Sequence, residues 1–245
     1  MPGLNSTIML RKITANIPNT ITCLSLFFGC IAVVMSFHFY EEIYGLPAYQ
    51  WAYIFIGAAA VCDFCDGASA RLLHAYSNLG KELDSLSDLV SFGVAPGMLV
   101  YNFMARQADT HPWLPFIAFI IPVMGELRLA RFNIDDRQTS SFLGMPIPAN
   151  AIFWIGFTAW MAKYTYVGQW LMAVIVVGMS LTMVLTGLKM FSLKFKNFKL
   201  KENLRRYIII LAAVVLVIVD GVAGFAWTIL FYLLLSLIPT SKNVA

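Results

Sequence analysis

Charged side chains are scarce in this sequence of 245 residues. Asp, Glu, Lys and Arg make up 12% of it, whereas a typical globular protein carries about 25%. Cysteine is also rare, with 4 residues, so the chain is not a disulfide-stapled secreted module. Hydrophobic residues make up 60% and the mean hydropathy is +0.75, which excludes a disordered chain and an ordinary cytosolic enzyme.

The sequence contains several long apolar runs. A membrane-spanning helix needs roughly 20 apolar residues, and eight runs approach that length, although the fifth and seventh are short. They cover residues 20–39, 49–73, 86–104, 113–131, 146–161, 169–190, 207–219 and 222–238. Asp220-Gly221, between the last two runs, predicts a tight helical hairpin. The sequence therefore predicts an all-α integral membrane protein with about eight transmembrane helices.

Basic residues are distributed unevenly over the loops between these runs. All 17 except Arg106 and Lys163 fall on one side when alternate loops are assigned to the same side. Cytoplasmic loops carry an excess of Lys and Arg, so both termini are expected in the cytoplasm. The expected regions are an amphipathic juxtamembrane segment (1–19), a six-helix core (20–190), a basic cytoplasmic loop (191–206) and a C-terminal helical hairpin with a short tail (207–245).

Four carboxylates cluster around the cytoplasmic loop between the second and third runs. Asp63 and Asp66 are three residues apart and share one face of a helix, and Asp84 and Asp88 share a face of the next helix. The connection between the two helices is short, so we expect them to be antiparallel neighbours. Both acidic faces then point into one cleft at the cytoplasmic membrane edge.

Such a cluster is suited to divalent cations. Four acids this close cannot all stay ionised alone, and Mg²⁺ or Mn²⁺ bind oxygen ligands that they often share with substrate phosphates. Gly67 and Ala70, on the face of Asp63, leave a slot for a ligand, and Arg71 carries a planar fork suited to phosphate oxygens. The set suggests a nucleotide diphosphate substrate and a pair of metal ions. The alternative is a group of solvated interface residues beside small helix-packing residues.

The same residues follow the pattern D-x2-D-G-x2-A-R-x8-G-x3-D-x3-D. The chain therefore resembles the CDP-alcohol phosphotransferases, whose signature this is. Its fixed positions are filled by Asp63, Asp66, Gly67, Ala70, Arg71, Gly80, Asp84 and Asp88. The wider sequence is similar to the branch of CDP-diacylglycerol–serine O-phosphatidyltransferases. That similarity rests on Pro18-Asn19-x-x-Thr22, Ser91-Phe92-Gly93-Val94-Ala95-Pro96, Arg128-Leu129-Ala130-Arg131-Phe132-Asn133 and Phe142-x-Gly144-Met145-Pro146.

This resemblance implies CDP-diacylglycerol and L-serine as substrates, with phosphatidylserine and CMP as products. Asp63, Asp66, Asp84 and Asp88 would bind two Mg²⁺ or Mn²⁺ ions, and Asp88 would also be the general base for the serine hydroxyl. The residues expected to bind CDP-diacylglycerol are Asn19, Thr22, Asp63, Gly67, Ala70, Arg71 and Gly80. The resemblance further implies the family's helical membrane fold and a homodimer. We expect the protein to lie in the bacterial inner membrane, with its active site facing the cytoplasm.

The binding site for serine must meet an ammonium group and a carboxylate. Glu126, Arg128 and Arg131, at the cytoplasmic end of the fourth run, offer one acid and two bases, and Asn133 could add a hydrogen bond. The alternative is that both arginines only contact lipid phosphates. The basic run 194–206 is expected to lie against anionic lipid headgroups.

The sequence fits other functions less well. A phosphorylated acceptor, such as glycerol 3-phosphate or inositol phosphate, would need a dense basic pocket, and an archaeal-type lipid donor is a further variant. The few basic residues near Glu126 favour a zwitterionic acceptor such as serine instead.

An ion or proton transporter is the alternative from another class. It would place its acids near the bilayer midplane and show repeated or interrupted helices, whereas the acids of this chain cluster at one membrane edge. Cys62-x-x-Cys65 lacks a second ligand pair for structural zinc, and no nucleic-acid partner is expected.

Overall fold

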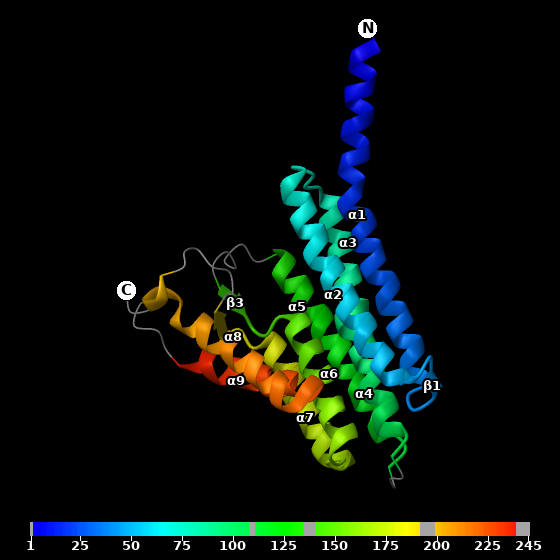
Figure 1. Cartoon of the computed structure of the whole chain (residues 1–245), viewed down its shortest axis with the longest axis vertical. Coiled ribbons are helices and arrows are strands. Elements are labelled where there is room, and N and C mark those ends of the chain that lie inside the picture. The colour runs from blue at the N-terminus through cyan, green and yellow to red at the C-terminus, as the bar shows by residue number, and fades with distance from the viewer. Residues whose placement is uncertain (1, 108–110, 135–140, 192–198, 239–245) are drawn as a thin grey trace. The chain divides into compact units, whose positions relative to one another are not determined.

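The computed structural model describes residues 2–107, 111–134, 141–191 and 199–238, without the side chains of 2–15, 141–142 and 201–202. The chain divides into two compact units, Met1–Leu99 and Val100–Ala245. Both units consist almost entirely of helices (Figure 1). The expectation of an all-α protein is therefore confirmed for the described residues.

The first unit is built around the long helix α1. Its elements are α1 (Pro2–Phe37), β1 (Glu42–Ile43), β2 (Leu46–Pro47), α2 (Ala48–Leu72), α3 (Asn78–Asp88), η1 (Leu89–Val94) and α4 (Ala95–Ala105), the last of which continues into the second unit. Helix α1 packs against α2 and also against α3 and η1. Because α2 and α3 both rest on α1, their acid-bearing segments meet beside it.

Two local features fix the start and the end of α3. The Ser77 hydroxyl oxygen caps its first turn by accepting a hydrogen bond from the Gly80 amide at 2.9 Å, an interaction that satisfies an otherwise unpaired amide. Directly after Asp88 the backbone changes to a π-helix, η1. Single π-helical turns are rare and often occur at functional sites.

The second unit contains the remaining helices and a small sheet. Its elements are η2 (Leu114–Phe119), α5 (Ile120–Ile134), β3 (Ser141–Leu143), α6 (Ile147–Lys163), α7 (Gln169–Val184), β4 (Lys189–Phe191), α8 (Leu200–Asp220), η3 (Gly221–Ala223) and α9 (Gly224–Leu237). Strands β3 and β4 pair antiparallel, with Phe142 opposite Met190. Helix α6 packs mainly against α9, and α5 packs against α7. At the predicted turn Asp220-Gly221, Gly221 has a φ of +62° between α8 and α9, and these two helices pack against each other.

One predicted boundary is wrong. The apolar run at 169–190 was expected to be a single helix, but α7 ends at Val184 and β4 begins at Lys189. The Gly144 amide donates a hydrogen bond to the Leu188 carbonyl at 2.8 Å, and the adjacent strand β3 pairs with β4. Pairing with a distant strand therefore overrides the local apolar pattern here.

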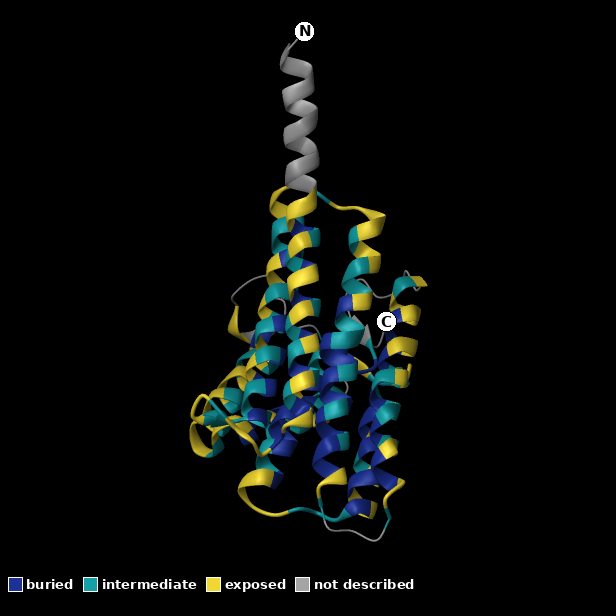
Figure 2. Cartoon of the chain, turned by 90° about the vertical axis from the view of Figure 1, so that its right-hand side faces the viewer, coloured by how far each residue is buried: buried dark blue, intermediate teal, exposed yellow. Residues whose placement is uncertain are grey.

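Within the described residues, four helical stretches are long and apolar enough to cross a membrane. They are Asn16–Phe37, Ala48–Leu72, Asn78–Ala105 and Asn203–Leu237. Asn16–Phe37, Ala48–Leu72 and Asn203–Leu237 carry many exposed apolar side chains, whereas residues 91–104 of the third stretch have none. Figure 2 shows exposed and buried residues along the helices. Exposed apolar side chains on long helices are those that contact lipid in a membrane protein.

Candidate active site

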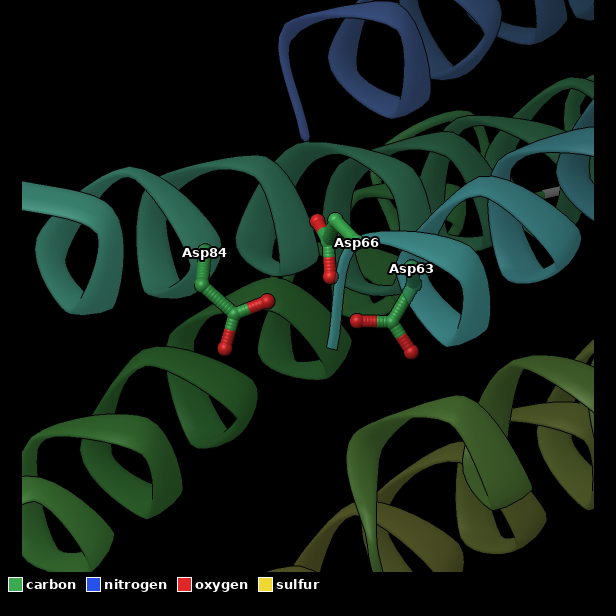
Figure 3. A group of neighbouring side chains, drawn as sticks. All are labelled: Asp63, Asp66 and Asp84. Atoms are coloured by element: carbon green, nitrogen blue, oxygen red, sulfur yellow. The ribbon is translucent and has the colours of Figure 1, made fainter. Parts of the chain in front are cut away.

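Three of the four predicted metal ligands lie close together. Asp63 and Asp66 on α2 and Asp84 on α3 turn their carboxylates toward one another (Figure 3). One oxygen from each lies within 4.8 Å of the others. Asp66 is 6% exposed, and Asp63 and Asp84 are half-buried. The short helix connection thus brings two acidic faces together, as the sequence predicted.

The fourth acid lies at the edge of this group. Asp88 is the last residue of α3 and is half-buried. Its side chain neighbours that of Asp63, which also neighbours Asp84. Asp63 therefore has both acids of α3 as neighbours, and Asp88 is beside the three-carboxylate group rather than within it.

The donor set suits a hard divalent cation. Every side chain in the group offers a carboxylate oxygen, the ligand type preferred by Mg²⁺ and Mn²⁺. Ionised carboxylates at such separations repel one another unless a cation or a proton lies between them. The described cysteines are all free thiols, and Cys62 and Cys65 take no part in the three-acid group.

Helix α1 contributes a direct contact to the acids. The Thr22 hydroxyl donates a hydrogen bond to Asp66 Oδ2 at 2.5 Å, and both residues are buried. Ser87, next to Asp88 on α3, donates from its hydroxyl to the Thr22 carbonyl at 3.1 Å. Thr22, expected to contact CDP-diacylglycerol, therefore touches Asp66, one of the predicted metal ligands.

The other residues predicted to bind CDP-diacylglycerol lie around the same helix ends. The Asn19 side chain lies against Gly80, where an added Cβ would stand 3.0 Å from Asn19 Oδ1. Beside Gly67 the space is open, since a Cβ there would meet no atom within 4 Å. Ala70 is half-buried and Arg71, in the last turn of α2, is exposed. The surface of α2 is therefore open at Gly67, next to Asp66.

Sequence reasoning missed a set of buried serine hydroxyls. Ser25 donates to the Ala59 carbonyl on α2 at 3.0 Å, and Ser91 of η1 donates to the Ser25 carbonyl at 3.0 Å. With Thr22 and Ser87 they form two similar layers of hydrogen bonds between α1 and its neighbours. The available signal was the recurrence of small hydroxyl residues at helical spacing within apolar runs, which is typical of helix contacts in membranes.

The residues predicted to bind serine all lie on α5, in the second unit. Arg128 is buried, at 8% exposed, and its guanidinium lies 5.6 Å from the centre of the Phe132 ring. Arg131 Nη1 donates to the Val184 carbonyl at the end of α7, at 2.9 Å. Glu126 is exposed and Asn133 is half-buried.

Part of the predicted basic strip lies outside the described residues, namely Lys194 and Lys196. Within the described part, Lys199 is exposed and Arg206 Nη1 donates to Asn203 Oδ1 at 2.6 Å. Arg205 and Arg206 are half-buried at the start of α8.

Comparison with known proteins identifies the family. Residues 15–184 match the family model for CDP-alcohol phosphatidyltransferases. The CDP-diacylglycerol–serine O-phosphatidyltransferase of Bacillus subtilis (strain 168) is 35% identical over 187 residues, which cover 74% of this chain and 92% of that protein. The protein of the same name from Helicobacter pylori (strain ATCC 700392 / 26695) is 30% identical over 224 residues, covering 90% and 89%. That from Methanocaldococcus jannaschii is 34% identical over 155 residues, covering 63% and 66%. The chain belongs to the CDP-alcohol phosphatidyltransferase family.

Proposed function

We propose that this protein transfers the phosphatidyl group of CDP-diacylglycerol to the hydroxyl of L-serine, with release of CMP. The observation that carries the proposal is the three-carboxylate group of Asp63, Asp66 and Asp84 within 4.8 Å. Relatives that match this chain over most of their own length are named CDP-diacylglycerol–serine O-phosphatidyltransferases. Membership in the family argues against the transporter alternative.

The four acids would carry out the transfer step. Asp63, Asp66, Asp84 and Asp88 would hold two Mg²⁺ or Mn²⁺ ions, which neutralise charge on the diphosphate and on the departing CMP. Asp88 accepts the proton of the serine hydroxyl, because that hydroxyl is a weak nucleophile that needs a positioned base. The hydroxyl oxygen then bonds to the phosphorus that bears diacylglycerol, and the bond from that phosphorus to the CMP oxygen breaks.

The residues around the acids would position the liponucleotide. Gly67 and Ala70 would leave room for the cytidine beside α2. The Asn19 side chain lies against Gly80, and both residues would line the same binding site. Arg71 would hold the diphosphate as an exposed guanidinium at the end of the helix. Thr22 and Asp63 complete the predicted binding set.

The acceptor serine would be bound by side chains of α5. Arg128 and Arg131 would bind its carboxylate, and Glu126 would bind its ammonium group. Asn133 would add a hydrogen bond to a polar atom of the substrate. The pairing of acid with base favours serine over a phosphorylated alcohol. Arg131 also donates to the Val184 carbonyl, and the Arg128 guanidinium lies against the Phe132 ring.

The membrane arrangement belongs to the same proposal. Each of the eight apolar runs overlaps a helix, which supports eight spans. The uneven distribution of Lys and Arg over the loops supports both termini in the cytoplasm and the four-region organisation set out from the sequence. The acids would then face the cytoplasm at the inner membrane of a bacterium. The basic strip would contact anionic lipid, and the family resemblance supports a homodimer.

A release assay tests the function. Purified full-length protein in detergent is incubated with CDP-diacylglycerol, a divalent cation and a panel of alcohols, and CMP is measured. Serine is expected to give turnover, whereas glycerol 3-phosphate and inositol phosphate are not. Turnover with a phosphorylated alcohol and none with serine would assign the chain to another branch of the family.

A further inference from the structure

Thr22 occupies a junction between the two acid-bearing helices. We propose that Thr22 is a positioning residue for the metal centre. In this role its hydroxyl fixes the orientation of Asp66, and its carbonyl fixes α3 through Ser87. The inference rests on the proposed metal site and adds to it a residue that binds no cation itself.

The contact with Asp66 is strong and directional. The Thr22 hydroxyl has one hydrogen and two acceptors within reach, Asp66 Oδ2 at 2.5 Å and the Pro18 carbonyl at 3.0 Å. A hydrogen bond to an ionised carboxylate is about twice as strong as one between neutral groups, so Asp66 takes the hydrogen when it is ionised. Threonine also has few side-chain rotamers in a helix. Asp66 is therefore held by a donor that is itself held in place.

The contact with α3 comes from the backbone of the same residue. The Ser87 hydroxyl donates to the Thr22 carbonyl at 3.1 Å, and Ser87 is 3% exposed. Ser87 lies between Asp84 and Asp88 in the sequence, so fixing it fixes the segment that carries both acids. Thr22 is thus bonded to an acid of α2 and to the acid-bearing segment of α3.

The next layer of hydrogen bonds separates this role from simple helix packing. One turn away on α1, Ser25 donates to the Ala59 carbonyl and accepts from Ser91. Ser25 is as buried as Thr22, at 1% against 4% exposed. Ser25 joins α1 to α2 and to η1, the segment that follows α3, but its hydroxyl ends on a backbone carbonyl rather than on a carboxylate. Ser25 is therefore a matched internal control.

The consequence concerns cation affinity. A ligand carboxylate that loses its hydrogen-bond donor is free to rotate, and loss of such outer partners typically costs 10–100-fold in metal affinity. We expect Thr22→Val, which keeps the shape and removes the hydroxyl, to weaken Mn²⁺ binding by about tenfold or more. Thr22→Ser, which keeps the hydroxyl, should bind Mn²⁺ nearly as the natural protein does.

Mn²⁺ binding to the purified full-length protein in detergent tests this without substrate or turnover. Free Mn²⁺ is followed by electron paramagnetic resonance as protein is titrated with the ion. The variants are Thr22→Val, Thr22→Ser, Ser25→Ala and Asp66→Asn. The expected order is natural affinity for Ser25→Ala, near-natural affinity for Thr22→Ser, and weakened binding for Thr22→Val and Asp66→Asn.

The outcomes separate the inference from the metal site on which it rests. Natural affinity in Thr22→Val with weakened affinity in Asp66→Asn would overturn the role of Thr22 and keep the site. Natural affinity in Asp66→Asn would overturn the site itself. Should Thr22→Val fail to fold, Thr22→Ala is compared with Thr22→Ser, since both lack the methyl group. Equal affinities in that pair would also overturn the inference.

Discussion

Gly156 on α6 lies so close to Ala226 on α9 that a Cβ on Gly156 would overlap the Ala226 backbone nitrogen. Such close approach of two helices through a small residue is typical of packing inside membranes. It joins the C-terminal hairpin of α8 and α9 to the helix that follows β3. The hairpin is therefore an integral part of the second unit rather than an appendage.

Gly156→Ala should accordingly destabilise the protein. Forcing extra atoms into a packed interface costs about 1–3 kcal/mol, and the obstructing atoms here belong to rigid backbone. The melting temperature in detergent is the measurement. Gly178→Ala on α7 is the control, because a Cβ there would meet nothing within 4 Å. A melting temperature for Gly156→Ala no lower than that of Gly178→Ala would contradict the close packing.

Asp88→Asn should abolish most turnover while the protein stays folded. The substitution removes the proposed base, and a positioned general base typically contributes about 10²–10⁴-fold to the rate. Binding of CDP-diacylglycerol should persist, since Asp88 lies beside the three-carboxylate group and not within it. CMP release and liponucleotide binding are measured side by side. The control is Glu82→Gln, an acid-to-amide change at an exposed position of the same helix, which should leave CMP release and liponucleotide binding unchanged. Near-natural turnover in Asp88→Asn would mean that Asp88 is not the base.

Removing divalent cations should lower both activity and stability. Asp63, Asp66 and Asp84 repel one another when no cation separates them. A ligand at a hundred times its dissociation constant stabilises the folded state by about 2.7 kcal/mol. Chelation should therefore stop CMP release and reduce the melting temperature, and added Mg²⁺ or Mn²⁺ should restore both. In Asp63→Asn/Asp84→Asn the melting temperature should no longer respond to the cation, whereas an unchanged response would place the stabilising ion elsewhere.

Much of the site could be predicted from local spacing. The i, i+3 relation of Asp63 and Asp66 fixes their shared face, and the short connection to α3 brings Asp84 to them. Spacing could not predict the Thr22–Asp66 hydrogen bond, because it joins residues 44 positions apart. It also missed the end of α7, where pairing between β3 and β4 decides the backbone. Local periodicity thus predicts helix faces, while contacts between distant segments depend on packing.

Gly67→Ala distinguishes a ligand slot from a packing contact. A Cβ at Gly67 meets no protein atom within 4 Å, and Ala is about 0.5–1 kcal/mol better than Gly within a helix. The folded protein should therefore be slightly stabilised, while the apparent KM for CDP-diacylglycerol rises because the methyl group occupies the proposed slot. Gly57→Ala, also open and on the same helix, should be stabilised without any change in KM. Equal KM values in the two variants would mean that the liponucleotide does not approach α2 at Gly67.

Arg128→Ala should raise the apparent KM for serine by about tenfold or more and leave that for CDP-diacylglycerol unchanged. The reason is that a hydrogen bond to a charged group is worth about 1.5–3 kcal/mol, and each 1.4 kcal/mol is a factor of ten. Arg131→Ala should affect serine less directly, since its guanidinium donates to the Val184 carbonyl and its loss also loosens the end of α7. Both variants should lower the melting temperature, since the buried Arg128 also packs over the Phe132 ring. Steady-state kinetics for both substrates, with melting curves for both variants, separate the two roles. An unchanged serine KM in both variants would mean that the acceptor binds away from this end of α5, leaving the two arginines as structural and lipid-facing residues.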